Sequence, residues 1–283
     1  MRWKTRAIAM VVVVVLMAVS FVIPVSAISD DEVAAPSAIL MEPNTGKILY
    51  EKNANELRPC ASITKVMTLV LVMEAIDSGK ISLEDQVTAS AHAASMGGSD
   101  IWLKEGETMS VNDLIKATVI MSANDAAVVL AEHVYGTEDE FVKQMNIRAK
   151  QLGMNDTTFK NCNGLDEDGH LTTAHDVALM SAELIKHEKI FDYTLTWMDY
   201  VRDGETQLVN TNKLIRSYKG ITGLKTGTTS QAGSCISATA KRDNLSLVAV
   251  VLGCSTTDER FTSASTLLDY GFANFSFASL QMP

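Results

Sequence analysis

Strand-forming segments lie at both ends of this chain, and helical segments lie between them. The stretch "SAILMEPNTGKILYEKN" predicts a hairpin, because an apolar strand is followed by an Asn-Thr-Gly turn and a second strand. From Gly220 onward, "GITGLKTGTTSQAGSCISATAKRDNLSLVAVVLG" is rich in β-branched residues and Gly with turn residues between, which again predicts strands. The last segment, "ERFTSASTLLDYGFANF", is predicted as a helix. This order predicts an α+β domain, with one antiparallel sheet of N- and C-terminal strands flanked by helices and an all-helical lobe.

A helix that starts at Ser62 is predicted to be buried on nearly all sides. Its apolar residues cover more than one face and Gly79 provides a stop; they are Ile63, Val66, Met67, Leu69, Val70, Val72 and Met73. Ser62 and Lys65 stand one turn apart at its start, and two interpretations are open. Either Ser62 caps the helix and Lys65 is solvated, or Ser62 is a nucleophile and Lys65 its base. A lone S-x-x-K is common by chance, so other motifs must decide.

The middle of the chain is predicted to be helical. "SVNDLIKATVIM" and "NDAAVVLAEHVYG" are two helical patterns separated by "SAND", and Asn124 or Asp125 is expected to cap the second. "EDEFVKQMNIRAKQLG" and "TTAHDVALMSAELIKH" are further amphipathic helices, and Thr172 or Thr173 is expected to cap the latter.

The first 27 residues have the pattern of an export signal. Three basic residues precede an apolar run that ends at Pro24, and the small residues up to Ala27 suit a signal peptidase. An uncleaved anchor is the alternative, because the run is close to the minimum of about 17 residues for a membrane span. Cleavage is favoured because the run is short and ends in Pro and small residues. We therefore expect a signal peptide at residues 1–27 and one domain at 28–283, which no repeat or linker divides.

The chain is acidic. Its formal charge is −10, and loss of residues 1–27, which carry three positive charges and no negative ones, would make it −13. Such a chain repels polyanions, which argues against nucleic acid or an anionic membrane surface as a partner.

No metal or cofactor is expected. The four cysteines lack C-x-x-C and zinc-finger spacings. The segment "LDEDGH" with Asp166, Asp168, His170 and, further on, His175 matches neither an EF-hand nor H-E-x-x-H, so it is interpreted as a solvated acidic loop.

Two of the cysteines, Cys235 and Cys254, are expected on one hairpin, "SCISATAKRDNLSLVAVVLGC". Its "KRDN" turn would place Cys235 opposite Val250. The two cysteines would then be several positions out of register, which is too far for a disulfide.

Three short motifs follow one another along the chain: Ser62-x-x-Lys65, Ser122-Ala123-Asn124 and Lys225-Thr226-Gly227. A lysine activates a serine only when its neutral form is accessible, and position i+3 puts both side chains on one helical face. Burial and a second cation, Lys225, would both lower the pKa of Lys65.

The other residues of the motifs fit acyl transfer. Ser122 is expected to relay a proton between Lys65 and a leaving nitrogen, and Asn124 to offer its amide to a substrate peptide group. Gly227 allows a strand to approach a bound peptide closely. The backbone N–H groups of Ser62 and Thr228 are the expected oxyanion hole.

Together and in this order, the motifs are the signature of penicillin-binding proteins and class A β-lactamases. The chain resembles the serine-type D-alanyl-D-alanine carboxypeptidases, which are low-molecular-mass penicillin-binding proteins, over nearly all of its mature length. The resemblance rests on the order and spacing of "RPCASITKVMT", "VIMSANDAA", "NCNGLDEDGHLTTAHDVA", "VNTNKLIRSYKGITGLKTGTT" and "LLDYGF". It implies a β-lactamase/transpeptidase-like fold, with the active site between the sheet edge and the helical region.

The resemblance also implies an activity. The substrate would be a peptidoglycan stem peptide ending in D-Ala-D-Ala, cut through an acyl-enzyme on Ser62, and β-lactam antibiotics would be covalent inhibitors. Arg260 matches a family arginine that, with Lys225 and Thr226, would hold the terminal carboxylate. The enzyme would be exported and would act at the outer face of the cytoplasmic membrane or in the cell wall of a bacterium.

Two other functions are open on this fold. A serine β-lactamase would need a deacylating glutamate, and no E-x-x-L-N-like segment lies between Asn124 and Lys225. A non-catalytic β-lactam sensor or peptidoglycan-binding module would need a signalling domain, which is not evident. Family members commonly continue into a β-rich domain and an amphipathic anchor, whereas this sequence stops at "SFASLQMP". Peripheral membrane association is therefore left open, as is transpeptidation.

Overall fold

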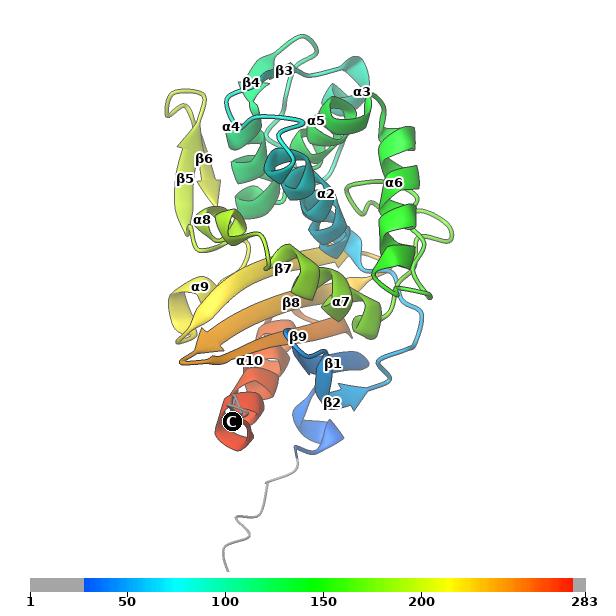
Figure 1. Cartoon of the computed structure of the whole chain (residues 1–283), viewed down its shortest axis with the longest axis vertical. Helices are drawn as coiled ribbons and strands as arrows, with labels where there is room; N and C mark the ends of the chain where they lie inside the picture. Colours follow the sequence, from blue (N-terminus) through cyan, green and yellow to red (C-terminus); the bar gives the residue numbers. More distant parts are fainter. Residues whose placement is uncertain (1–27, 277–283) are drawn as a thin grey trace, which may run out of the picture.

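A computed structural model describes residues 28–276 of the chain (Figure 1). The predicted signal peptide and residues 277–283 lie outside this part. Among the described helices, none combines the length and the apolar character needed to span a membrane.

As the sequence predicts, the strands of the main sheet lie near the two ends of the chain and most of the helices lie between them. The strands are β1 (Ser37–Glu42), β2 (Lys47–Lys52), β3 (Gln86–Thr88), β4 (Thr108–Ser110), β5 (Met198–Val201), β6 (Thr206–Val209), β7 (Ile221–Thr229), β8 (Gly233–Arg242) and β9 (Leu245–Cys254). The helices are α2 (Lys65–Asp77), α3 (Ala91–Ala94), α4 (Val111–Lys116), α5 (Asn124–Tyr135), α6 (Glu138–Gln151), α7 (Ala174–Leu184), α8 (Phe191–Thr194), α9 (Leu214–Ser217) and α10 (Thr257–Asn274). Shorter turns of helix are η1 (Asp30–Glu32), η2 (Ala61–Thr64), η3 (Ala117–Met121), which is a π-helix, and η4 (Glu188–Ile190).

The main sheet joins the two ends of the chain. Its strand order is β2-β1-β9-β8-β7, and every neighbouring pair is antiparallel. The predicted N-terminal hairpin is therefore confirmed, and β1 pairs with β9 to close the sheet. β7, which carries the Lys-Thr-Gly motif, is an edge strand and so has one side free for other parts of the molecule.

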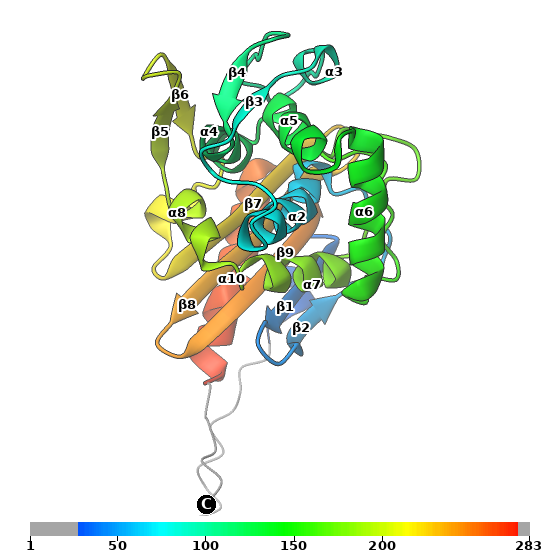
Figure 2. The same cartoon turned by 45° about the horizontal axis from the view of Figure 1, so that its top comes forward.

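Helices cover both faces of this sheet. α10 lies on one face and the helical lobe, with α2 and α7 nearest the sheet, lies on the other (Figures 1 and 2). Alternate residues of β1 serve the two layers: Ile39 and Met41 join the core of the lobe, and Ala38 and Leu40 join the core beneath α10. Full burial of a large apolar side chain such as Ile39, Leu40 or Met41 stabilises the fold by about 2 kcal/mol.

The helix α2 is the buried element that the sequence predicts. Residues 65–73 are all buried, including Lys65. A helix that is apolar all round can only be stable inside the protein. The alternative in which Lys65 is a solvated first-turn residue is therefore wrong.

Two helix starts differ from the expectation. Ser62 lies in η2 and the α-helix begins at Lys65, so Ser62 is not its N-cap. The N-cap of α5 is Ala123 instead of Asn124 or Asp125, because both polar side chains are used in contacts with other segments. Thr173 does cap α7, accepting the Asp176 N–H at 3.1 Å, as predicted.

The register of the C-terminal hairpin also differs. Val250 pairs with Ser237, and Cys235 lies at a bulge between the pairs Ser234–Cys254 and Ile236–Val251. The predicted Cys235–Val250 pair is wrong because the turn contains only Asp243 and Asn244 instead of the four residues of "KRDN", which moves the partner of Val250 by two residues. The four cysteines are buried free thiols. Two short hairpins, β3–β4 and β5–β6, were not predicted.

Candidate active site

The fold brings the three motifs together. Ser62 comes from η2, Lys65 from the start of α2, Ser122 and Asn124 from the junction of η3 and α5, and Lys225 from β7. Figure 2 shows α2 lying across the sheet beside β7, with α5 next to it. Hydrogen bonds connect the motifs directly, from Lys65 to Ser62 and Asn124 and from Lys225 to Ser122.

Ser62 is held against the edge strand. A Cβ atom on Gly227 would lie 2.7 Å from the Cys60 carbonyl oxygen and 3.0 Å from the Ser62 nitrogen, so only glycine lets β7 pack this closely on η2. On the other side, a Cβ on Gly164 would lie 2.0 Å from the Ala61 carbonyl oxygen. The predicted close approach at Gly227 exists, but in this structure its partner is the backbone beside Ser62.

Lys65 has three acceptors around its ammonium group. Nζ lies 3.0 Å from Ser62 Oγ, 2.5 Å from Asn124 Oδ1 and 2.7 Å from the Asn163 carbonyl oxygen. An ammonium has three N–H donors, so the three bonds account for all of them. When Lys65 is neutral, the Asn124 and Asn163 oxygens can keep the two remaining N–H groups, which leaves the lone pair directed at Ser62.

The electrostatics of the site favour that neutral form. Burial lowers the pKa of Lys65 from 10.5 to about 7, against the opposing effects of the Cys162 thiol and the Asp100 and Asp125 carboxylates. From the sequence, Lys225 is also expected to lower the pKa of Lys65. The effect instead falls on Lys225, whose pKa is lowered well below its ordinary value by burial, then by Lys65 and Arg260.

Ser122 is bonded to the second lysine. Its backbone is left-handed, with φ of 66°, at the end of η3, and this turn directs the hydroxyl to Lys225 Nζ at 2.8 Å. Lys225 also donates to the Thr226 carbonyl oxygen at 2.9 Å. Within residues 28–276, the Ser122 hydroxyl forms a hydrogen bond with Lys225 and none with Lys65. The proton relay between Lys65 and a leaving nitrogen, which the motif predicts for Ser122, stays a prediction.

Asn124 has a different set of contacts from the one expected. Its Oδ1 accepts from Lys65, and its Nδ2 donates to the Gly97 carbonyl oxygen at 2.6 Å. Gly98 is needed beside it, because a Cβ there would lie 2.9 Å from Asn124 Nδ2. In this structure the amide orients the lysine, and both of its polar atoms already have protein partners.

Thr226 and Arg260, which are both predicted to bind the substrate carboxylate, have different surroundings. The Thr226 hydroxyl is buried and bonded to Thr211 Oγ1 at 2.7 Å, so it is not free for a ligand here. Arg260, from α10, reaches the end of β7, where Nη1 donates to the Gly227 carbonyl oxygen at 3.1 Å and to Thr228 Oγ1 at 2.8 Å. Arg260 therefore lies beside the Lys-Thr-Gly motif, and its role in holding a carboxylate stays a prediction.

Three basic side chains of the site have no carboxylate partner. Lys65, Lys225 and Arg260 are all buried, yet none of them forms an ion pair with a carboxylate in the described part of the chain. The Arg260 Nε–H is in addition buried without a hydrogen-bond partner. Buried charges are normally paired, so this arrangement is suited to an anionic ligand.

Sequence reasoning missed several residues of the site. The Asn163 carbonyl, which binds Lys65, belongs to the backbone and leaves no signal in a motif. Asp125 accepts the N–H groups of Ile101 and Leu103 at 3.2 Å and 2.9 Å, and thereby fixes the loop beside Asn124. The carboxylate next to the Asn of the second motif could have drawn attention to this contact.

The acidic loop only partly matches its interpretation. Asp166 and Asp168 are exposed, but Asp166 accepts a hydrogen bond from Thr229 Oγ1 at 2.6 Å and so connects the loop to β7. His170 is buried and lies 2.8 Å from Thr64 Oγ1, in the turn that carries Ser62. Burial lowers the pKa of His170 to about 4. Within residues 28–276, no group of three or more His, Cys, Asp or Glu side chains is arranged to hold a metal ion.

Comparisons with known proteins identify relatives of this chain. The chain is 49% identical over 244 residues to D-alanyl-D-alanine carboxypeptidase DacF of Bacillus subtilis; the match covers 85% of this chain and 63% of the relative, so the chain spans less than two thirds of that protein. Penicillin-binding protein 6B of Escherichia coli has a TM-score of 0.85 at 34% identity, over 92% of this chain and 83% of that one.

A third similar protein is penicillin-binding protein D2 of Listeria monocytogenes, solved in its ampicillin-bound form. Its TM-score is 0.78 at 36% identity, over 85% of this chain and 98% of that one. The predicted fold class is thus confirmed. The family model for D-alanyl-D-alanine carboxypeptidase, peptidase family S11, matches residues 24–256. Because that match covers most of the sequence, the chain belongs to the D-alanyl-D-alanine carboxypeptidase family.

Proposed function

We propose that this protein is a serine D-Ala-D-Ala carboxypeptidase, which removes the terminal D-alanine from peptidoglycan stem peptides through an acyl-enzyme on Ser62. One observation carries the proposal. Lys65, with its pKa lowered to about 7, lies 3.0 Å from Ser62 Oγ, and two other acceptors hold its remaining N–H groups. A base with a pKa near the working pH is the most effective for general base catalysis.

In the first half-reaction, the neutral amine of Lys65 takes the Ser62 hydroxyl proton while Oγ attacks the carbonyl carbon of the penultimate D-alanine. The N–H groups of Ser62 and Thr228 stabilise the oxyanion that forms. The C–N bond then breaks, and the proton that Lys65 took from Ser62 passes through the Ser122 hydroxyl to the leaving nitrogen, so Lys65 is neutral again; the bond between Lys225 and Ser122 orients that hydroxyl. D-Alanine leaves, and the stem peptide stays bound as an ester of Ser62.

In the second half-reaction, water attacks the ester carbonyl carbon. Lys65 takes the proton of this water and returns a proton to Ser62 Oγ as the ester bond breaks, so the enzyme is restored and a stem peptide shorter by one D-alanine is released. The sum of both steps is hydrolysis of one peptide bond, and no other reactant is required.

Recognition of the substrate relies on its free carboxylate. Arg260 supplies a buried positive charge, and Lys225 is a buried amine that a bound anion would keep protonated; neither has a carboxylate partner in the described residues. A charge-assisted bond from such a cation to a terminal carboxylate distinguishes a carboxypeptidase from an endopeptidase. The carboxylate of a β-lactam antibiotic offers the same charge, and we propose β-lactams as covalent inhibitors.

The proposal includes the setting of the enzyme. We infer that residues 1–27 are an export signal and that residues 28–283 form one catalytic unit, which acts at the outer face of the cytoplasmic membrane or in the cell wall of a bacterium, with peripheral membrane association left as a further proposal.

The test is mass spectrometry of the products formed from diacetyl-L-Lys-D-Ala-D-Ala. The proposal predicts free D-alanine and diacetyl-L-Lys-D-Ala in equal amounts, and neither from the Ser62→Ala variant. Absence of D-alanine release by a folded protein that has a free active site would contradict the proposal.

A further inference from the structure

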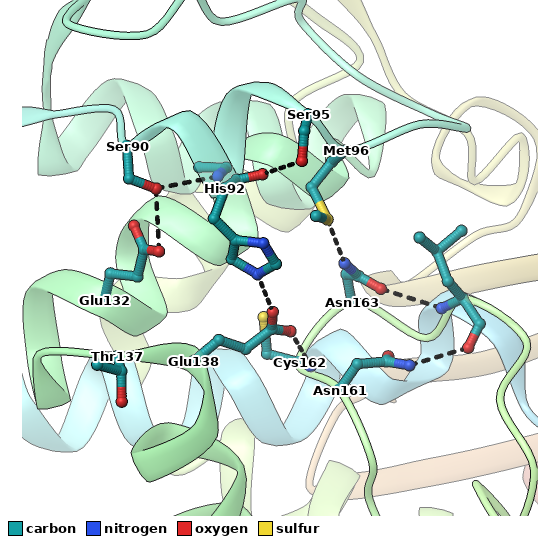
Figure 3. Close-up of polar contacts among 12 residues, drawn as sticks. Ser90, His92, Ser95, Met96, Glu132, Thr137, Glu138, Asn161, Cys162 and Asn163 are labelled. Carbon is teal, nitrogen blue, oxygen red and sulfur yellow. Dashed lines mark hydrogen bonds and ion pairs between the residues drawn. The ribbon is translucent and has the colours of Figure 1, made fainter.

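The base Lys65 depends on a loop that lies outside the three short motifs. Its third acceptor is the Asn163 carbonyl oxygen at 2.7 Å, and Asn163 lies between α6 and α7, outside any helix or strand. Figure 3 shows this loop next to α3 and α6. The side chain of Asn163 contributes to the fold of the loop, because its Oδ1 accepts the Leu165 N–H at 3.0 Å and its Nδ2 donates to Met96 Sδ at 3.4 Å.

The residue just before it is held from two sides. The Cys162 N–H donates to Glu138 Oε1 at 2.9 Å, and the Cys162 carbonyl oxygen accepts from Thr68 Oγ1 at 2.6 Å. Thr68 is on α2, three residues after Lys65, and Glu138 is the first residue of α6. Cys162 is therefore fixed between two helices immediately before the carbonyl that binds the base.

Glu138 is well placed to hold this position. Its side chain is 14% exposed, and its second oxygen, Oε2, lies 2.6 Å from His92 Nε2 on α3 (Figure 3). Burial opposes ionisation, but the hydrogen bonds from Cys162 and His92 outweigh it, so the pKa of Glu138 is lowered and the group is a carboxylate at neutral pH. Both oxygens of the carboxylate are thereby fixed, one by the loop and one by the neighbouring helix.

We propose that Glu138 is a positioning residue for acylation: by accepting the Cys162 N–H, it holds the Asn163 carbonyl on Lys65 and so directs the lone pair of the base at Ser62. The more exposed His92 holds the second oxygen of this carboxylate in place. This inference rests on the proposed function, because it assigns Lys65 the role of base. It adds a side chain that contacts neither the substrate nor the reacting atoms.

The effect can be measured because the contact joins the Cys162 backbone N–H to the Glu138 side chain, and that side chain can be changed by mutation. Without the carboxylate, the buried Cys162 N–H has no acceptor and the loop must shift to reach water. A misplacement of about 1 Å in an active site can reduce the rate by about 10²-fold. Water near Lys65 would also relieve the burial that lowers its pKa, so the neutral amine would appear only at higher pH.

The experiment measures the second-order rate of labelling by a fluorescent penicillin from pH 5 to 9, with melting temperatures to verify folding. For Glu138→Ala we expect labelling to be slower by about tenfold or more, with its acidic limb moved to higher pH. Glu138→Gln keeps an acceptor oxygen for the Cys162 N–H and should remain within about threefold of the wild type. Glu140→Ala is the matched control, because that carboxylate lies on the same helix and bonds only Gln144 and Lys143 in the described residues.

Glu138→Asp keeps the charge but shortens the side chain by one methylene, and we expect labelling of this variant to be slow as well. This variant provides a test even if Glu138→Ala does not fold. The inference is overturned by a folded Glu138→Ala or Glu138→Asp variant with the wild-type rate and pH profile. It is also overturned by a Glu138→Gln variant as slow as Glu138→Asp. Failure of the wild type itself to be labelled would contradict the proposed function and not the positioning role.

Discussion

Acylation of Ser62 should depend on pH with an acidic limb near 7. The neutral amine of Lys65 is the form that accepts the serine proton, and burial lowers its pKa from 10.5 to about 7. At pH 7 about half of the molecules then carry the neutral amine. With an ordinary lysine pKa this fraction would be about 0.03%, so the shift is worth about 1,500-fold in active enzyme at that pH.

The sign follows from the protonation of the base. Below the pKa, each unit of pH removes nine tenths of the remaining neutral amine, so the rate should fall about tenfold per unit. Above about pH 8, the rate should reach a plateau with respect to this group. The assay is the second-order rate of labelling by a fluorescent penicillin from pH 5 to 9, with circular dichroism at each pH to verify that the protein is folded.

Lys65→Arg is the matched perturbation. It keeps a positive charge near Ser62 but replaces the amine by a guanidinium, which is not deprotonated in this range. We expect a loss of about 10³-fold or more at every pH up to 9. A wild-type rate that is independent of pH between 5 and 8, or a Lys65→Arg variant with near-normal labelling, would refute the assignment of Lys65 as the base.

Three further predictions concern neighbouring parts of the structure. Gly227→Ala would place a methyl group 2.7 Å from the Cys60 carbonyl oxygen, and labelling should fall by about 10²-fold; a wild-type labelling rate would show that the close packing is not needed. Amidation of the substrate terminus should reduce D-alanine release by the wild type, and Arg260→Gln should narrow the difference between free-acid and amidated substrates; equal cleavage of both by the wild type would contradict recognition of the carboxylate. Thr173→Ala should lower the free energy of unfolding by about 1 kcal/mol in urea titrations while labelling stays unchanged, because this cap lies on α7, which carries none of the motifs.

The sequence predicts much of this architecture because its long apolar segments are distinct. The nearly continuous apolar runs of β1, β9 and α2 are dictated by burial, and Thr173 reveals the start of α7. The third motif lies on an edge strand beside Ser62 because of the strand order of the sheet, and that order could not be predicted from the sequence. The short hairpins β3–β4 and β5–β6 were missed because so few residues carry no clear alternation.

The roles of the motif residues were less predictable than their presence. A motif contains Asn124 but not its partner, and the structure gives that amide to Lys65 and Gly97. Ser122 likewise meets Lys225, because its left-handed backbone turns the hydroxyl toward β7. Glu138 and the Asn163 carbonyl lie outside the three short motifs, and only tertiary packing brings them to the base.

The most direct test of the account is the fate of the acyl-enzyme. Opening of a β-lactam requires only Ser62, its base and the oxyanion donors, whereas rapid release requires a group that activates water beside the ester, such as the glutamate of class A β-lactamases. Intact-protein mass spectrometry after a short incubation with benzylpenicillin, followed over time once free drug is removed, measures both steps. The account predicts a single adduct on the wild type that lasts for minutes or longer and no adduct on Ser62→Ala. Rapid loss of the adduct with many turnovers of hydrolysed penicillin would identify a β-lactamase instead, and an adduct on Ser62→Ala would show that another residue is the nucleophile.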